Sequence, residues 1–142
     1  MDIIFASNNQ GKVREVRAML EDTNIKIHSL SDLELHIDVV EDGNSFLENA
    51  LIKATTIAGL IRRPVLADDS GLEVDALGGA PGIYSARYGG KDLKDEERMA
   101  LLLSELEEVP EEKRTARFVC AMALVMPDGN NYVTRGVCEG TI

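Results

Sequence analysis

The stretch that decides the fold runs from Leu66 to Asp75 and reads LADDSGLEVD. It begins as a short apolar run, which is typical of a buried strand bounded by turn residues. The run opens directly onto two carboxylates, a hydroxyl and a glycine, so we expect the strand to deliver oxygen groups to a cleft. Mg²⁺ prefers carboxylate, water and phosphate oxygens to nitrogen or sulfur ligands. The pattern therefore indicates an enzyme that handles phosphates.

The remaining segments predict strands that alternate with helices. Ser45 and Glu48 form a capping box that starts the clearest helix, which Pro64 ends. Apolar spacing predicts strands at residues 2–6, 25–29, 115–126 and 131–138, with further helices near 12–20 and 92–108. The buried strand at 65–67 has a possible continuation at 72–75. This order favours an α/β domain with a mixed sheet.

Composition limits the class of protein. The 142 residues, 44% of them apolar, suit a single domain spanning 1–142 with one ordinary core. Acidic residues outnumber basic ones by 25 to 15, and the net charge of −10 argues against nucleic acid as the main partner. The N-terminus lacks a basic region and a long apolar run, so we expect no signal peptide, no membrane segment and a cytoplasmic location. Cys120 and Cys138 are too few for a disulfide framework, so reduced structural thiols are expected.

The turn between the first strand and the first helix is a candidate phosphate site. Ser7, Asn9 and Lys12 surround the expected helix N-terminus, where unpaired amides and the helix dipole favour an anion. The segment lacks the glycine spacing of a P-loop or a dinucleotide fingerprint. The simpler interpretation stays open, in which Ser7 or Asn9 caps the helix and Lys12 is solvated.

The carboxylates are candidate metal ligands. Successive strand residues point to opposite faces, so Asp68 and Asp69 are not expected to share one cleft if the strand persists through them. One would then be a ligand or base, and the other would organise the loop. Glu41, just before the capping box, is a second candidate ligand, although it also suits a helix N-terminus as a favourable charge. Lys53 lies on the polar side of the capped helix, where a solvated lysine is the simpler interpretation.

Three segments in order resemble the inosine triphosphate pyrophosphatase family. They are SNNQGKVRE at 7–15, EDGNSFLENA at 41–50 followed by Lys53, and ADDSGL at 67–72 continued by GAPGIYSARY at 79–88. The ordered set is specific and spans nearly all of the chain. The resemblance implies Mg²⁺-dependent attack of water at the α-phosphate of ITP, dITP or XTP, which releases the monophosphate and pyrophosphate and cleanses the nucleotide pool. It also implies an elongated mixed β-sheet flanked by helices, with a cleft between two lobes, assembled as a homodimer.

The resemblance also implies roles for individual residues. Glu41 would bind the metal, and Asp69 would bind the metal and activate the water. Lys53 would be a second cationic contact to phosphate, and Ser70 would contact the substrate. The phosphates would be held by Ser7, Asn8, Asn9, Gln10, Gly11 and Lys12.

The chain departs from the family pattern after the long hairpin. Family members continue into a glycine-rich aromatic-Gly-Tyr-Asp loop and a Ser-His-Arg segment that contact the base, and the sequence ends at Ile142 without either. His28 and His36 lie in other contexts, so we expect a C-terminally truncated version that lacks base recognition. One alternative is a catalytically incompetent fragment that binds nucleotide or dimerises. Another, resting on Asp68 and Asp69 alone, is a phosphatase with an aspartyl nucleophile.

Overall fold

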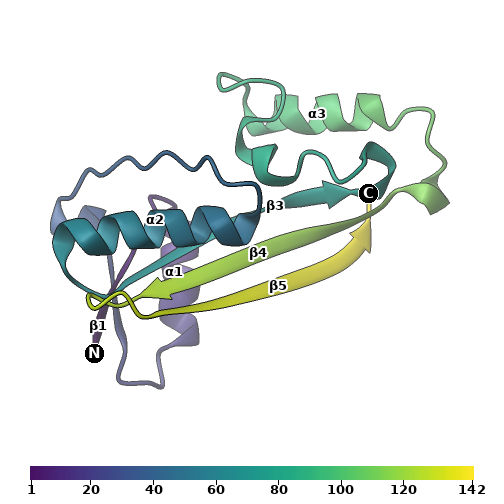
Figure 1. Ribbon diagram of the computed structural model, residues 1–142. Coiled ribbons are helices and arrows are strands. Elements are labelled where there is room, and N and C mark those ends of the chain that lie inside the picture. The colour runs from purple at the N-terminus through teal and green to yellow at the C-terminus, as the bar shows by residue number, and fades with distance from the viewer. The chain divides into compact units, whose positions relative to one another are not determined.

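The computed structural model describes residues 1–142 and contains a five-stranded sheet in the order β2-β1-β3-β4-β5. Strand β1 pairs in parallel with β2 and with β3, and Figure 1 shows β4 running against both β3 and β5. The strands are β1 (Asp2–Phe5), β2 (Lys26–Ser29), β3 (Val65–Val74), β4 (Thr115–Val125) and β5 (Asn131–Thr141). The helices are α1 (Gln10–Met19), α2 (Phe46–Ile61) and α3 (Asp95–Glu105), with 3₁₀ turns η1 (Ser31–Leu33), η2 (Asp75–Leu77), η3 (Gly82–Arg87) and η4 (Glu111–Lys113). The predicted α/β class with a mixed sheet is confirmed.

The chain divides into two compact units. The first comprises residues 1–69 and 121–135, and the second comprises 70–120 and 136–142. The first unit therefore contains β1, α1, β2, α2 and the start of β3, whereas the second contains α3.

Alternation along β1 builds the two apolar layers of the first unit. Ile3 and Phe5 pack with Val13 of α1, whereas Ile4 packs with Ala54 and Ile57 of α2. Because successive strand side chains point to opposite faces, α1 and α2 cover opposite faces of this part of the sheet (Figure 1). The same alternation applies to β3, where Leu66 joins the layer of α1 and Ala67 joins that of α2.

Strand β3 is longer than the sequence indicates. It runs without a break from Val65 to Val74, so the segment from Asp68 to Gly71 lies within the strand and not in a loop that follows it. In the second unit, the end of β3 is held by Arg117 of β4. The guanidinium lies 2.9 Å from Asp75, 3.0 Å from Glu139 and 3.6 Å from Glu73. Arg117 of β4 thus joins the end of β3 to residues that lie beyond the strand in sequence.

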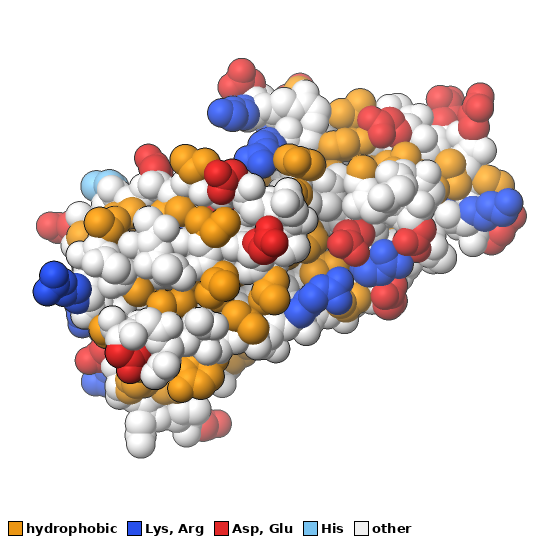
Figure 2. Space-filling view, viewed as in Figure 1, with side chains coloured by type: hydrophobic (Ala, Val, Ile, Leu, Met, Phe, Trp, Pro, Cys, Tyr) orange, Lys and Arg blue, Asp and Glu red, His pale blue; other side chains and the backbone are white.

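On the face seen in Figure 2, the acidic side chains are dispersed and do not gather into one large patch. Basic side chains lie among them, and the net charge of the chain is −10. None of the helices combines the length and the apolar character needed to cross a lipid bilayer.

Hydrogen bonds at the start of α2 hold the end of the loop that precedes this helix. Ser45 is the N-cap, and its Oγ accepts a hydrogen bond from the Glu48 amide at 3.0 Å, as the capping box predicts. The Glu48 carboxylate accepts from the amide of Asn44 at 2.6 Å, one residue before the N-cap. The helix ends at Ile61, and its C-cap residue Arg62 adopts a left-handed conformation with φ of 54° shortly before Pro64.

We expect Ser45→Ala to lower the free energy of unfolding by about 1 kcal/mol, because the Glu48 amide loses its acceptor at the helix start. Urea denaturation followed by circular dichroism measures this change. Thr56→Ala, an exposed change within the same helix, is the matched control and should alter stability by less than about 0.5 kcal/mol. Equal effects of the two substitutions would contradict the capping role.

Candidate active site

The first unit contains a polar pocket of about 290 Å³ beside the end of β1. The topology of the sheet explains the position of the pocket. Strand β1 has parallel neighbours on both sides, and helices α1 and α2 lie on opposite faces of the sheet, so the strand order reverses beside β1. Ligands of open α/β sheets bind at such switch points, beyond the carboxyl ends of the strands. The polar residues that line the pocket are Ser7, Asn8, Asn9, Lys12, Asp38, Glu41, Lys53 and Asp68.

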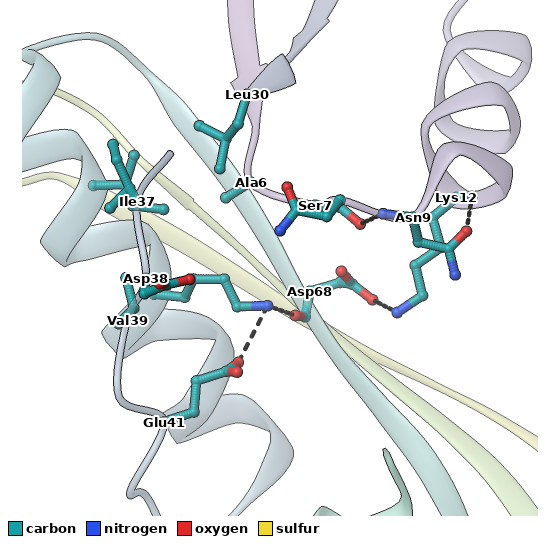
Figure 3. Close-up of a pocket in the computed structure, with 13 residues that line it drawn as sticks. Ala6, Ser7, Asn9, Lys12, Leu30, Ile37, Asp38, Val39, Glu41 and Asp68 are labelled. Carbon is teal, nitrogen blue, oxygen red and sulfur yellow. Dashed lines mark hydrogen bonds and ion pairs between the residues drawn. The ribbon is translucent and has the colours of Figure 1, made fainter. Parts of the chain in front are cut away.

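The turn before α1 presents its polar groups to this pocket (Figure 3). Asn9 is the N-cap of α1, and its Oδ1 accepts from the Lys12 amide at 3.2 Å, while the Asn9 amide donates to Ser7 Oγ at 3.1 Å. The capping role left open for Asn9 is therefore observed. Gln10 and Gly11 form the first turn of α1 but do not line the pocket, and Gln10 Nε2 donates to Ser31 Oγ at 3.3 Å.

Lys12 is not simply solvated. Its Nζ lies 2.6 Å from Oδ2 of Asp68, a carboxylate that is only 4% exposed. Continuing the β1–β3 register by two residues places Asp68 level with Ser7, directly beside the N-terminus of α1. Asp68, and not Asp69, is therefore the member of the acidic pair that lines the pocket.

Lys53 also points into the pocket and not to solvent. Its Nζ donates to the backbone oxygen of Asp68 at 2.9 Å and lies 3.1 Å from Glu41 Oε1 (Figure 3). The ion pair with Glu41 is poorly aligned, because Oε1 is buried yet accepts no hydrogen bond. A buried carboxylate oxygen without a hydrogen bond is costly. Glu41 thus offers an oxygen to a further cation or donor.

Asp69 faces the opposite side of β3 from Asp68, as strand alternation predicts. Its Oδ2 accepts from Asn49 Nδ2 of α2 at 3.0 Å. Burial raises the pKa of the Asp69 carboxyl, and the charge of Glu41 raises this pKa further, while the Asn49 hydrogen bond and Lys53 oppose the shift. Asp69 is therefore a desolvated carboxyl close enough to Glu41 to sense its charge.

Ser70 falls in the second unit. There it lines a largely apolar cavity of about 540 Å³ together with Leu72, Phe118 and Cys138. The first unit brings together six of the predicted residues in one pocket: Ser7, Asn8, Asn9, Lys12, Glu41 and Lys53.

Two residues at the site were not predicted. Asp38 lines the pocket from an irregular loop, and its sequence context carries no signal. Asn49 contacts Asp69, and the signal for it was available. It is a polar residue three positions after Phe46 and one before Ala50, within the spacing of the buried face of α2.

The chemistry of the carboxylates fits one of the ways in which proteins hold Mg²⁺. Nowhere in residues 1–142 do three or more His, Cys, Asp or Glu side chains gather in an arrangement able to hold a metal ion. Mg²⁺ is usually held by one or two carboxylates, with water and substrate phosphates completing the shell. Glu41, whose Oε1 lies 3.1 Å from Lys53 Nζ but accepts no hydrogen bond, and Asp69, whose pKa is raised by the charge of Glu41, are two carboxylates of the kind that such a site needs.

Comparison with known proteins assigns the family, because the model of the Ham1 family matches residues 3–142. The chain belongs to the Ham1 family. A Geobacillus kaustophilus relative, named dITP/XTP pyrophosphatase, is 48% identical over 141 residues, which are 99% of this chain and 69% of the relative. The resemblance seen in the motifs is thereby confirmed.

Solved structures agree with the family assignment. A crystal structure from Mycobacterium abscessus, of a nucleoside-triphosphatase or dITP/XTP pyrophosphatase, has a TM-score of 0.85 at 43% identity and covers 100% of this chain and 74% of its own. A HAM1 protein from Coxiella burnetii has a TM-score of 0.90 at 39% identity, over 100% of this chain and 73% of its own. The named dITP/XTP pyrophosphatases are nucleoside triphosphate pyrophosphohydrolases.

We expect Asp69→Asn to raise the thermal midpoint at pH 7 in the presence of EDTA. Since the pKa of Asp69 lies above its ordinary value of 3.8, the folded protein holds this proton more tightly than the unfolded chain. The wild type therefore loses stability as the pH rises from about 3.8 through the raised pKa, and the variant does not. Calorimetry at several pH values should show a difference that shrinks toward pH 4.

Asp75→Asn is the control with the opposite sign. Hydrogen bonds from Thr115 and Arg117 lower the pKa of Asp75, so its charge stabilises the fold above the ordinary pKa and this gain is lost as the pH falls. This variant should have a lower midpoint at pH 7. A lower midpoint for Asp69→Asn as well would contradict the assigned burial cost.

Proposed function

We propose that the chain, acting through residues 1–142 as one catalytic domain, hydrolyses dITP, XTP and ITP to the monophosphate and pyrophosphate with the help of Mg²⁺. The observation that carries this proposal is the convergence of Lys12 and Lys53 on Asp68 and Glu41 in one polar pocket. The Ham1 relatives named dITP/XTP pyrophosphatase support the substrate class. We place the reaction in the cytoplasm and in a homodimer, as the resemblance implies, where it would remove deaminated nucleotides from the pool.

The first step is capture of the triphosphate by local positive charge. Two ammonium groups and the N-terminus of α1 meet in this pocket, although the chain as a whole carries −10. Phosphate oxygens exchange for Asp68 at Lys12 and for Glu41 at Lys53, while Ser7, Asn8 and Asn9 donate to the same oxygens. Holding the chain of phosphates at several points orients the α-phosphorus for attack.

The second step is attack by water. Glu41 and Asp69 would hold the Mg²⁺, which when bound neutralises phosphate charge and lowers the pKa of water. The water oxygen forms a bond to the α-phosphorus as the bond to the α–β bridging oxygen breaks, and pyrophosphate leaves. Asp69 accepts the proton that the attacking water releases. Asn49 holds this carboxylate in place through Oδ2.

We expect Mg²⁺-dependent release of pyrophosphate from dITP and XTP to fall at least about 10²-fold in Asp69→Asn, because the variant loses a proton acceptor and a metal ligand. A coupled pyrophosphate assay, with dATP and GTP as comparison substrates and EDTA as a blank, measures this. Asp22→Asn, at an exposed site on the protein surface, is the matched control and should keep wild-type activity.

Binding and product measurements distinguish the pyrophosphatase from the two other functions considered for this sequence. Calorimetric binding of ITP without turnover would favour a catalytically incompetent nucleotide-binding fragment. Orthophosphate as the product would favour an aspartyl phosphatase. Full activity of Asp69→Asn would remove this residue from the mechanism while leaving the pocket as the phosphate site.

A further inference from the structure

Asn49 is a buried polar residue that joins two parts of the site. Only 2% of its surface is exposed, and it projects from α2. Its Nδ2 donates to Asp69 Oδ2 at 3.0 Å, and its Oδ1 accepts from the amide of Gly43 at 2.8 Å. One side chain therefore links strand β3 to the loop that carries Glu41.

The chemistry of the two partners fixes the orientation of this amide. Gly43 offers only a donor, and the ionised Asp69 carboxylate offers only acceptors. A flipped Asn49 side chain would set its NH₂ against the Gly43 N–H and its oxygen against the carboxylate. Both groups of the amide are therefore used, and only one orientation satisfies them.

The loop depends on this contact more than on its own backbone. Residues 35–43 form neither helix nor strand, and the Gly43 amide is the first after that of Leu35 to donate a hydrogen bond within the protein. Position 43 is also closely packed. A Cβ there would lie 2.7 Å from Glu48 Cβ and 2.8 Å from Asn49 Oδ1. The close approach of the loop to α2 therefore requires glycine.

We propose that Asn49 is a positioning residue that fixes the Glu41 loop relative to Asp69, so that the two carboxylates are arranged for a divalent cation before it binds. The inference rests on the proposed function, because that function assigns Glu41 and Asp69 to the metal. Asn49 is proposed to touch neither the metal nor the substrate. It acts through the carboxylate it holds and through the loop it anchors.

The test is Mn²⁺ binding to the intact chain without nucleotide, followed by the electron paramagnetic resonance signal of free Mn²⁺. Asn49→Leu keeps the branched shape and the number of side-chain heavy atoms but removes both hydrogen bonds, and we expect about tenfold weaker binding, as is typical for partners of metal ligands. Gly43→Ala disturbs the same link from the loop side and should weaken binding similarly. If Asn49→Leu fails to fold, the Mn²⁺ affinity of Gly43→Ala tests the proposal in its place.

Ala58→Gly is the matched control, because it weakens α2 at a buried position and leaves the Asn49 contacts in place. It should bind Mn²⁺ within about twofold of the wild type. In turnover assays, Asn49→Leu should need about tenfold more Mg²⁺ for half-maximal activity than the wild type.

Two results would overturn the inference while the proposed function stands. One is a folded Asn49→Leu variant with wild-type Mn²⁺ affinity, and the other is an equal loss in Ala58→Gly, which would reduce Asn49 to a purely structural role. A wild-type chain that neither binds Mn²⁺ nor hydrolyses dITP would instead overturn the proposed function, and this inference with it.

Discussion

The alternation of side chains along β3 is the constraint on which the site depends. Asp68 and Asp69 are adjacent in sequence but belong to opposite faces, so one carboxylate meets Lys12 of α1 and the other meets Asn49 of α2. A shift of the strand by one residue would exchange the two faces and break both contacts together. Two carboxylates side by side on one face would repel each other. The alternation of the strand reduces this repulsion, because it directs Asp68 and Asp69 to opposite faces of the sheet. The strand thus gives each helix one carboxylate to position.

Pairing of charges explains how an acidic chain keeps a site suited to an anion. Asp68 is almost fully buried and needs a cationic or hydrogen-bonding partner, which Lys12 supplies. Lys53 is likewise held between the Asp68 backbone and Glu41. In the proposed function, both ammonium groups would therefore be ordered before a phosphate arrives, which would lower the entropic cost of capture. In that function the two carboxylates would compete with the phosphate for the ammonium groups, so the pocket would favour a ligand with enough negative charge to displace both.

Local features were predictable from sequence, and long-range ones were not. The N-cap of α2 at Ser45 follows from neighbours within one turn, and the opposite orientation of Asp68 and Asp69 follows from strand geometry. The continuity of β3 through its polar centre was only a possibility in the sequence, because its partners come from other elements. Lys12 and Asp68 are 56 positions apart, and no local pattern specifies that they meet. The motifs named most of the pocket residues, but spacing alone could not tell which acid would line it.

Two opposing effects act on the pKa of the Asp69 carboxyl. Burial raises the pKa of its carboxyl and makes it a better proton acceptor, whereas the Asn49 hydrogen bond favours the ionised form and lowers that pKa. Removing Asn49 would make the carboxylate more basic, but the side chain would then lose the contact that holds it to α2. A single amide donor holds the group in place at a modest cost in basicity. The nearby charge of Glu41 raises the pKa of Asp69 again, so the loop that Asn49 anchors also offsets the effect of its hydrogen bond.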